Sequence, residues 1–243
     1  MKTSLLAGVL ILLSPAAHAD EQTDAFVEGN LIAVLYHELG HALIDIMALP
    51  VFGQEEDAAD VLSVLLIDAL FEEDSAVSLT YEAAFGFLGE ADAMAAEGGE
   101  PAYWDVHGAD LQRYYNLVCL FYGANPEERE DVAADLDLPQ ERADSCEEEF
   151  ELAADSWGAV LGDLEVGAPG ETLQFEAADP DSLTARTVRD EVAALNESFA
   201  LPESLSITVE SCGEPNAFYN PEAKQITICA EFEERLRSLA PAE

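Results

Sequence analysis

Two histidines four residues apart, His37 and His41, lie in an apolar stretch of the sequence and have Glu38 between them. The flanking residues 30–36 and 42–47 contain no proline and follow the periodicity of one amphipathic helix. Residues four apart on a helix project from the same face, so both imidazoles can face a single point. The pattern predicts a helix that borders a site. The alternative is a core helix whose histidines are hydrogen-bonded in the interior.

The motif His-Glu-x-x-His is typical of a metal centre that hydrolyses peptide bonds. His37 and His41 would hold one zinc ion, which lowers the pKa of a water molecule towards neutrality. The carboxylate of Glu38 would take the proton of that water, which makes Glu38 the candidate general base. Gly40 costs helix stability, and its presence indicates close packing or substrate access at this point of the helix.

A catalytic zinc ion usually has three protein ligands, so a third one must come from elsewhere in the chain. The sequence predicts a second helix over residues 54–70, on which Glu56 and Asp60 share a face. A short connection makes the two helices antiparallel neighbours, so Glu56 can complete the zinc site. Asp60 can then accept the second ring N–H of a ligating histidine. Glu55, Asp60 and Glu151 remain alternative third ligands.

The two motifs together resemble the gluzincin group of zincin metallopeptidases, in which HExxH is followed by ExxxD, here Glu56 to Asp60. The wider pattern HELGHALID, LP, G and EEDAAD is similar to a family of uncharacterised bacterial exported proteins classed as metallopeptidases. Residues 107–119 and 212–229 resemble further segments of that family. The resemblance implies a zinc-dependent peptidase with an active-site helix pair. It also implies a small sheet beside that pair, whose edge strand holds the substrate.

The segment Asn216 to Tyr219 resembles that edge strand, although here it follows the zinc motif instead of preceding it. A structural hairpin is the alternative interpretation. Tyr219, His107 and Arg113 are also candidates for stabilising the oxyanion of a tetrahedral intermediate. Alternatively, His107 caps the following helix and Arg113 pairs with a buried acid.

The chain carries 51 acidic and 9 basic residues, which give a formal net charge of −42. Nucleic acid is excluded as an expected partner because phosphate binding needs a basic surface. The expected partner is a peptide or protein substrate, and the sequence indicates no oligomeric state. An apolar content of 49% is enough for a folded core.

The first nineteen residues have the organisation of a secretory signal peptide. Lys2 precedes an apolar core over residues 5–13, and Ala17 to Ala19 forms a small-residue cleavage site. The apolar stretch is too short to span a membrane. We therefore expect a mature chain over residues 20–243, without stable membrane insertion, in the periplasm or outside the cell.

Four cysteines in the mature chain indicate two disulfides in such a compartment. Three pairings are open to four cysteines. Cys212 and Cys229 flank a predicted hairpin, which makes them natural partners. Cys119 and Cys146 would then join two helices.

The rest of the sequence predicts a predominantly helical α+β fold in a single domain over residues 20–243. Helices are expected through residues 24–163, including one over residues 140–160. They are followed by an acidic loop region at residues 164–181, for which weak strands are the alternative. A further helix and a small antiparallel sheet with a hairpin complete the chain over residues 182–243. The predicted function is an exported zinc metallopeptidase. The alternative is a non-catalytic module that binds a peptide or an envelope polymer on a zincin scaffold.

Overall fold

The computed structural model describes residues 15–241. Helices predominate and a four-stranded sheet lies near the C-terminus, so the predicted helical α+β fold is confirmed. In chain order the elements are α1 (Pro15–Ile46), α2 (Glu55–Leu70), α3 (Glu73–Ala96), α4 (Asp110–Ala124), α5 (Glu130–Asp135), α6 (Gln140–Ala143), α7 (Cys146–Leu164), β1 (Leu173–Ala177), α8 (Leu183–Ser198), β2 (Leu205–Glu210), β3 (Ala217–Asn220), β4 (Gln225–Cys229) and α9 (Glu231–Leu239).

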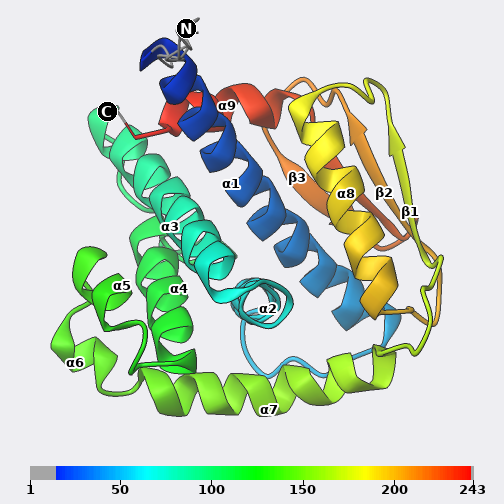
Figure 1. The fold of residues 1–243 in the computed structure, drawn as a ribbon, viewed down its shortest axis with the longest axis horizontal. Helices are drawn as coiled ribbons and strands as arrows, with labels where there is room; N and C mark the ends of the chain where they lie inside the picture. Colours follow the sequence, from blue (N-terminus) through cyan, green and yellow to red (C-terminus); the bar gives the residue numbers. More distant parts are fainter. Residues whose placement is uncertain (1–14, 242–243) are drawn as a thin grey trace, which may run out of the picture.

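Helix α1 runs through the centre of the molecule, with α2, α3 and α4 on one side and α8 and the sheet on the other (Figure 1). Its apolar residues are buried on nearly every side, from Phe26 and Leu31 to Leu35 and Leu43. A helix surrounded in this way holds its side chains in fixed positions. The histidine motif therefore lies on a helix that is enclosed by the rest of the fold.

The sheet is mixed, with the strand order β1-β2-β4-β3. Strand β2 pairs in parallel with β1 and β4, and only β3 and β4 are antiparallel. The prediction of an antiparallel sheet was therefore wrong, although the hairpin of β3 and β4 was predicted. The reason is that α8 connects β1 to β2, and a helical crossover returns the chain in the same direction. Strand β1 itself lies within the acidic stretch for which the sequence left a loop or weak strands open.

The predicted helix over residues 140–160 is divided into α6 and α7, with a break at Asp144 and Ser145. Beside this break, Gly123 of α4 lies so close to Cys146 that an added Cβ would be 2.1 Å from the carbonyl oxygen of Cys146. The disulfide between Cys119 and Cys146 fixes the same contact. Tertiary packing at this point therefore interrupts a sequence that favours one continuous helix.

Both predicted disulfides are present, Cys119 with Cys146 and Cys212 with Cys229. Disulfides of this kind are typical of proteins outside the reducing cytoplasm. Across residues 15–241, none of the helices has the length and apolarity required to cross a bilayer. Most of the predicted signal peptide lies outside the described residues, and the predicted cleavage site falls in the first turns of α1.

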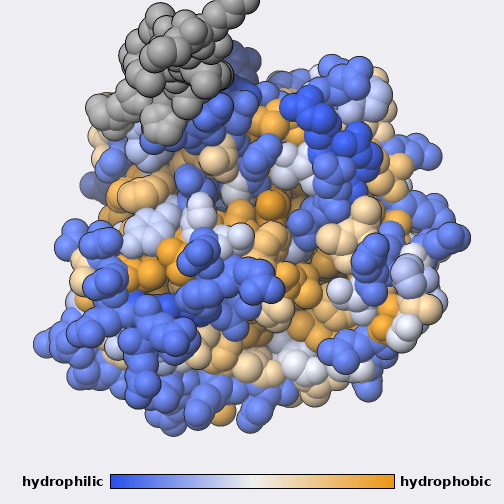
Figure 2. All heavy atoms as spheres, in the orientation of Figure 1, coloured by the Kyte–Doolittle hydropathy of each residue, from blue (hydrophilic) through white to orange (hydrophobic). Residues whose placement is uncertain are grey.

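Figure 2 shows the same face of the molecule with hydrophilic residues around its rim and a band of apolar residues across its middle. The hydrophilic rim agrees with the large excess of acidic residues in the sequence.

Candidate metal centre

The contact between α1 and α2 depends on Gly40. A Cβ added at Gly40 would be 2.8 Å from Cα of Ala59, which is closer than side chains approach in folded proteins. Glycine therefore allows α2 to lie directly against α1. The connection between the helices is short and contains Ala48 with a φ of 51°, so the chain turns back and α2 packs against α1. The glycine of the motif serves the close packing that the sequence suggested.

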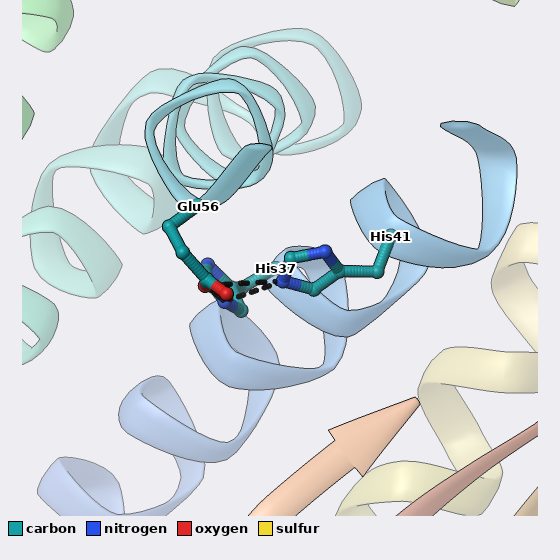
Figure 3. Close-up of side chains that lie close together, drawn as sticks. All are labelled: His37, His41 and Glu56. Carbon is teal, nitrogen blue, oxygen red and sulfur yellow. Dashed lines mark hydrogen bonds and ion pairs between the residues drawn. The ribbon is translucent and has the colours of Figure 1, made fainter. Parts of the chain in front are cut away.

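This packing brings Glu56 of α2 to the two histidines of α1 (Figure 3). The Oε2 atom of Glu56 lies 3.2 Å from Nε2 of His37 and 3.2 Å from Nε2 of His41. The two Nε2 atoms are themselves 3.2 Å apart. One atom from each residue therefore faces a common point, and the three atoms lie within 4.8 Å of one another.

The other nitrogen of each imidazole is held by a second carboxylate. Nδ1 of His37 lies 2.7 Å from Oδ1 of Asp60, and Nδ1 of His41 lies 2.8 Å from Oε1 of Glu55. An Nδ1–H group donated to a carboxylate leaves the Nε2 lone pair free for a metal. Asp60 thus makes the contact with a histidine ring nitrogen that the sequence predicted. Glu55 contacts Nδ1 of His41, on the side of the ring away from Glu56. Glu151 is exposed on α7 and is not part of the cluster.

Arg113 of α4 forms a two-pronged ion pair with Asp60. Its Nε and Nη2 atoms donate to the two carboxylate oxygens at 2.7 Å each. The guanidinium also lies over the ring of Phe87, 4.5 Å from its centroid. Burial raises the pKa of Asp60, but the bonds from Arg113 and His37 outweigh it and lower the pKa to about 2. Asp60 therefore stays ionised, and Arg113 is engaged with an acid as the sequence alternative stated.

The charges of the cluster stabilise one another. Burial by itself lowers the pKa of His37, but hydrogen bonds to Asp60 and Glu56 raise it to about 9. Burial would raise the pKa of Glu56, yet hydrogen bonds from His107, His37 and His41 hold it far below its usual range. Without a metal, the imidazole of His37 is therefore protonated on both nitrogens and positively charged at neutral pH. The carboxylates of Glu56 and Asp60 beside it are ionised.

Glu38 is buried next to this cluster, with only 6% of its surface exposed. Burial raises the pKa of its carboxyl, whereas the nearby His37 and His41 lower it. A carboxyl with a raised pKa accepts a proton more readily than one in water. Glu38 thus has the position and the basicity that a general base needs.

His107 reaches the cluster from the segment between α3 and α4. Its Nε2 atom lies 2.9 Å from Oε2 of Glu56, and its ring centroid is 6.2 Å from that of His37. Its side chain remains 46% exposed. The alternative in which His107 caps α4 is wrong, because the N-cap residue of that helix is Ala109. Tertiary folding has instead brought His107 to the candidate third ligand.

Tyr219 makes a contact that the sequence did not suggest. Its hydroxyl donates to Oδ2 of Asp45 at 2.6 Å, and Lys224 binds the same carboxylate. These bonds connect the hairpin of β3 and β4 to the last turn of α1. Asp45 follows His41 by four residues, so its position on the same helix face was a signal available in the sequence.

Strand β3 is the last strand of the sheet beside the cluster, and within residues 15–241 no other strand pairs with its outer edge. The amide of Cys229 donates to the carbonyl of Asn216, so residues 216, 218 and 220 face β4 in the alternating pattern of an antiparallel pair. The backbone groups of Ala217 and Tyr219 consequently face away from the sheet. Such an edge can pair with another extended chain.

Two hollows meet at the cluster, and His37, Glu38, His107 and Ala217 border both of them. The smaller hollow has a volume of about 460 Å³, and the larger one about 580 Å³. The larger is lined by apolar side chains from five helices: Val34, Val64, Phe87, Leu117, Leu120 and Leu236. A molecule that lies along β3 can therefore extend to either side of Glu38.

Comparison with protein families gives a match over most of the chain. The model of a family described as "Putative metallopeptidase" matches residues 4–161 and 176–242, which is most of the chain. No curated protein and no solved structure matches the chain significantly.

Proposed function

This chain belongs to that family of metallopeptidases, and on this premise we propose that it is an exported, zinc-dependent peptidase that acts on peptides or proteins. The observation that carries the proposal is the convergence of His37, His41 and Glu56 on one point. Glu38, buried beside that point, supplies the base that peptide hydrolysis requires.

The three side chains suit a zinc ion. Two imidazole nitrogens and one carboxylate oxygen are a donor set found in catalytic zinc sites, which keep a fourth position for water or substrate. Glu55 and Asp60 orient the rings from the opposite side, as outer carboxylates do at such sites. When bound, zinc would lower the pKa of water and polarise the carbonyl group of the substrate.

The chain's own residues would perform the proton transfers. Glu38 accepts the proton of the attacking water and then returns it to the nitrogen of the leaving amine. His107 borders both hollows, where its ring N–H can donate to the carbonyl oxygen as negative charge develops there. Arg113 serves differently, because its bonds to Asp60 hold His37 in place indirectly.

The free edge of β3 provides a place for an extended peptide. Strand addition would use the backbone groups of Ala217 and Tyr219 and lay the peptide past Glu38. The net charge of −42 favours cationic peptides over anionic ones. The two disulfides support export, since they persist in oxidising compartments.

Removal and return of zinc tests the proposal. We expect the purified mature chain to bind about one zinc ion and to cleave members of a broad peptide library. A chelator should abolish cleavage, and added zinc should restore it, because the ion supplies the polarising charge. Circular dichroism on both forms verifies that the fold is retained. A protein that binds zinc and cleaves no peptide would instead be a binding module.

Zinc affinity is expected to rise with pH. Protonated His37, with a pKa of about 9 in the metal-free protein, must release its proton before Nε2 can bind a metal. Each displaced proton makes affinity rise about tenfold per pH unit below that pKa, so we expect a rise of at least about a hundredfold from about pH 6 to about pH 8. Competition with a zinc-binding dye measures this dependence. An affinity that is constant over that range would contradict the assignment.

A further inference from the structure

The segment that connects α3 to α4, residues 97–109, exposes apolar side chains unusually close together. Tyr103 and Trp104 are each 87% exposed, and Val106 is 62% exposed. Burial of large apolar side chains stabilises a folded chain, so this segment loses stabilisation by leaving three of them in water. Single exposed apolar residues are ordinary, but three within four positions form a patch of the kind that marks a binding surface. We call this segment the aromatic loop.

The aromatic loop is lightly held by the rest of the described chain. Its internal hydrogen bonds are local, from the amide of Tyr103 to Pro101 and from the amide of Asp105 to Ala102. Within residues 15–241, the side-chain bond that joins the loop to another element is that of His107 with Glu56. At the start of the loop, the amides of Gly98 and Gly99 donate to carbonyl groups of α3, so the loop is attached to that helix there. Between this attachment and His107 the loop has few hydrogen bonds to other elements, and such a segment moves more easily than the helices beside it.

The loop ends at the candidate metal centre. His107 borders both hollows, and Trp104 precedes it by three residues. Three residues of extended chain span at most about 11 Å, so the aromatic rings are within reach of a peptide lying beside Glu38. The larger hollow, which His107 borders, also has apolar side chains in its wall, among them Phe87 and Leu117.

We propose that Tyr103 and Trp104 are substrate-binding residues that close over a bulky apolar side chain of the peptide, whose tip enters the larger hollow. This inference rests on the proposed peptidase function and adds a substrate class to it. Preferred substrates are cationic peptides with a large apolar residue next to the cleaved bond. The positive charges suit the acidic chain, and the apolar residue covers the surface that the aromatic loop leaves exposed.

Tryptophan fluorescence can report this closure because the two tryptophans differ in exposure. Trp104 is 87% exposed, whereas Trp157 on α7 is 7% exposed. The experiment uses the zinc-loaded mature chain with Glu38→Gln, which binds peptide without turning it over. The probes are two end-blocked peptides of alanine and lysine, one with a central phenylalanine and the other with serine in its place. Neither peptide contributes tryptophan emission.

We expect the phenylalanine peptide to shift the emission to shorter wavelength and to protect Trp104 from acrylamide, a neutral quencher that the acidic surface does not repel. The serine peptide should do neither at the same concentration. Trp104→Ala should weaken binding of the phenylalanine peptide by about tenfold, and Trp104→Phe should retain most of the affinity. Leu111→Ala, at an exposed position on α4, is the control and should leave binding unchanged.

The outcomes separate this inference from the proposed function. If wild-type protein cleaves the phenylalanine peptide while Trp104 emission and quenching do not change, the aromatic loop has no part in binding and the inference is overturned. Equal affinity of Trp104→Ala and the unsubstituted chain would overturn it as well. If zinc-loaded wild-type protein cleaves neither peptide nor any member of a broad library, the peptidase proposal fails, and this inference fails with it.

Discussion

Replacing Glu38 with glutamine is expected to lower kcat for peptide hydrolysis by about 10²–10⁴-fold while the protein still binds one zinc ion. Glutamine has nearly the same shape as glutamate and fits the buried position. It cannot accept a proton from water, so the transfer that we propose for Glu38 would be lost. Initial rates on a cleaved library peptide measure the effect, together with metal analysis of the same sample.

A second buried glutamate provides the matched control. Glu191 on α8 accepts a hydrogen bond from Tyr36, and Glu191→Gln keeps an oxygen for that bond. We expect Glu191→Gln to leave kcat within a few fold of wild type, because this residue lies outside both hollows. Glu38→Gln protein with full activity would show that another group activates the water.

The second large effect concerns the neighbouring pair Glu55 and Glu56. Glu56→Gln should weaken zinc binding by more than about a hundredfold, since it removes the carboxylate that faces both Nε2 atoms. Glu55→Gln should weaken it by only about 10–100-fold, because Glu55 orients His41 through Nδ1. Competition titrations with a zinc-binding dye at one pH measure both affinities.

These two variants are each other's control, since they make the same chemical change at adjacent positions of one helix. Both residues lie in the first turn of α2, so the effect on helix stability is similar. The reverse order of affinities would make Glu55 the third ligand. Equal, small effects would exclude both residues from the metal's own coordination.

The convergence of His37, His41 and Glu56 could be predicted from the sequence because it depends on local features. The spacing of His37 and His41 and the short connection to Glu56 each depend on helix geometry over a few residues. The contact of His107 with Glu56 depends on a segment fifty residues away, and no periodic pattern encodes it. His107 was therefore named as a candidate without its partner.

The sheet was harder to predict for a similar reason. Alternating residues identified β2, but the order of strands depends on how α8 crosses from β1 to β2. Strand β1 lies in an acidic stretch with glycine and proline nearby, which masks its alternation. The break between α6 and α7 likewise follows from the contact of Gly123 with Cys146, which local sequence does not reveal.

The close contact of Gly40 with Ala59 makes the metal centre sensitive to the spacing of two helices. Metal–ligand distances tolerate deviations of only about 0.2 Å. A side chain at position 40 would have to move α2 outwards by several times that amount, because its Cβ would begin 2.8 Å from Cα of Ala59. The third and fourth positions of HExxH have no role in the proposed coordination, yet here packing restricts the fourth position, Gly40, to glycine. Any change that moves α2 away from α1 is therefore expected to lower the affinity for the ion.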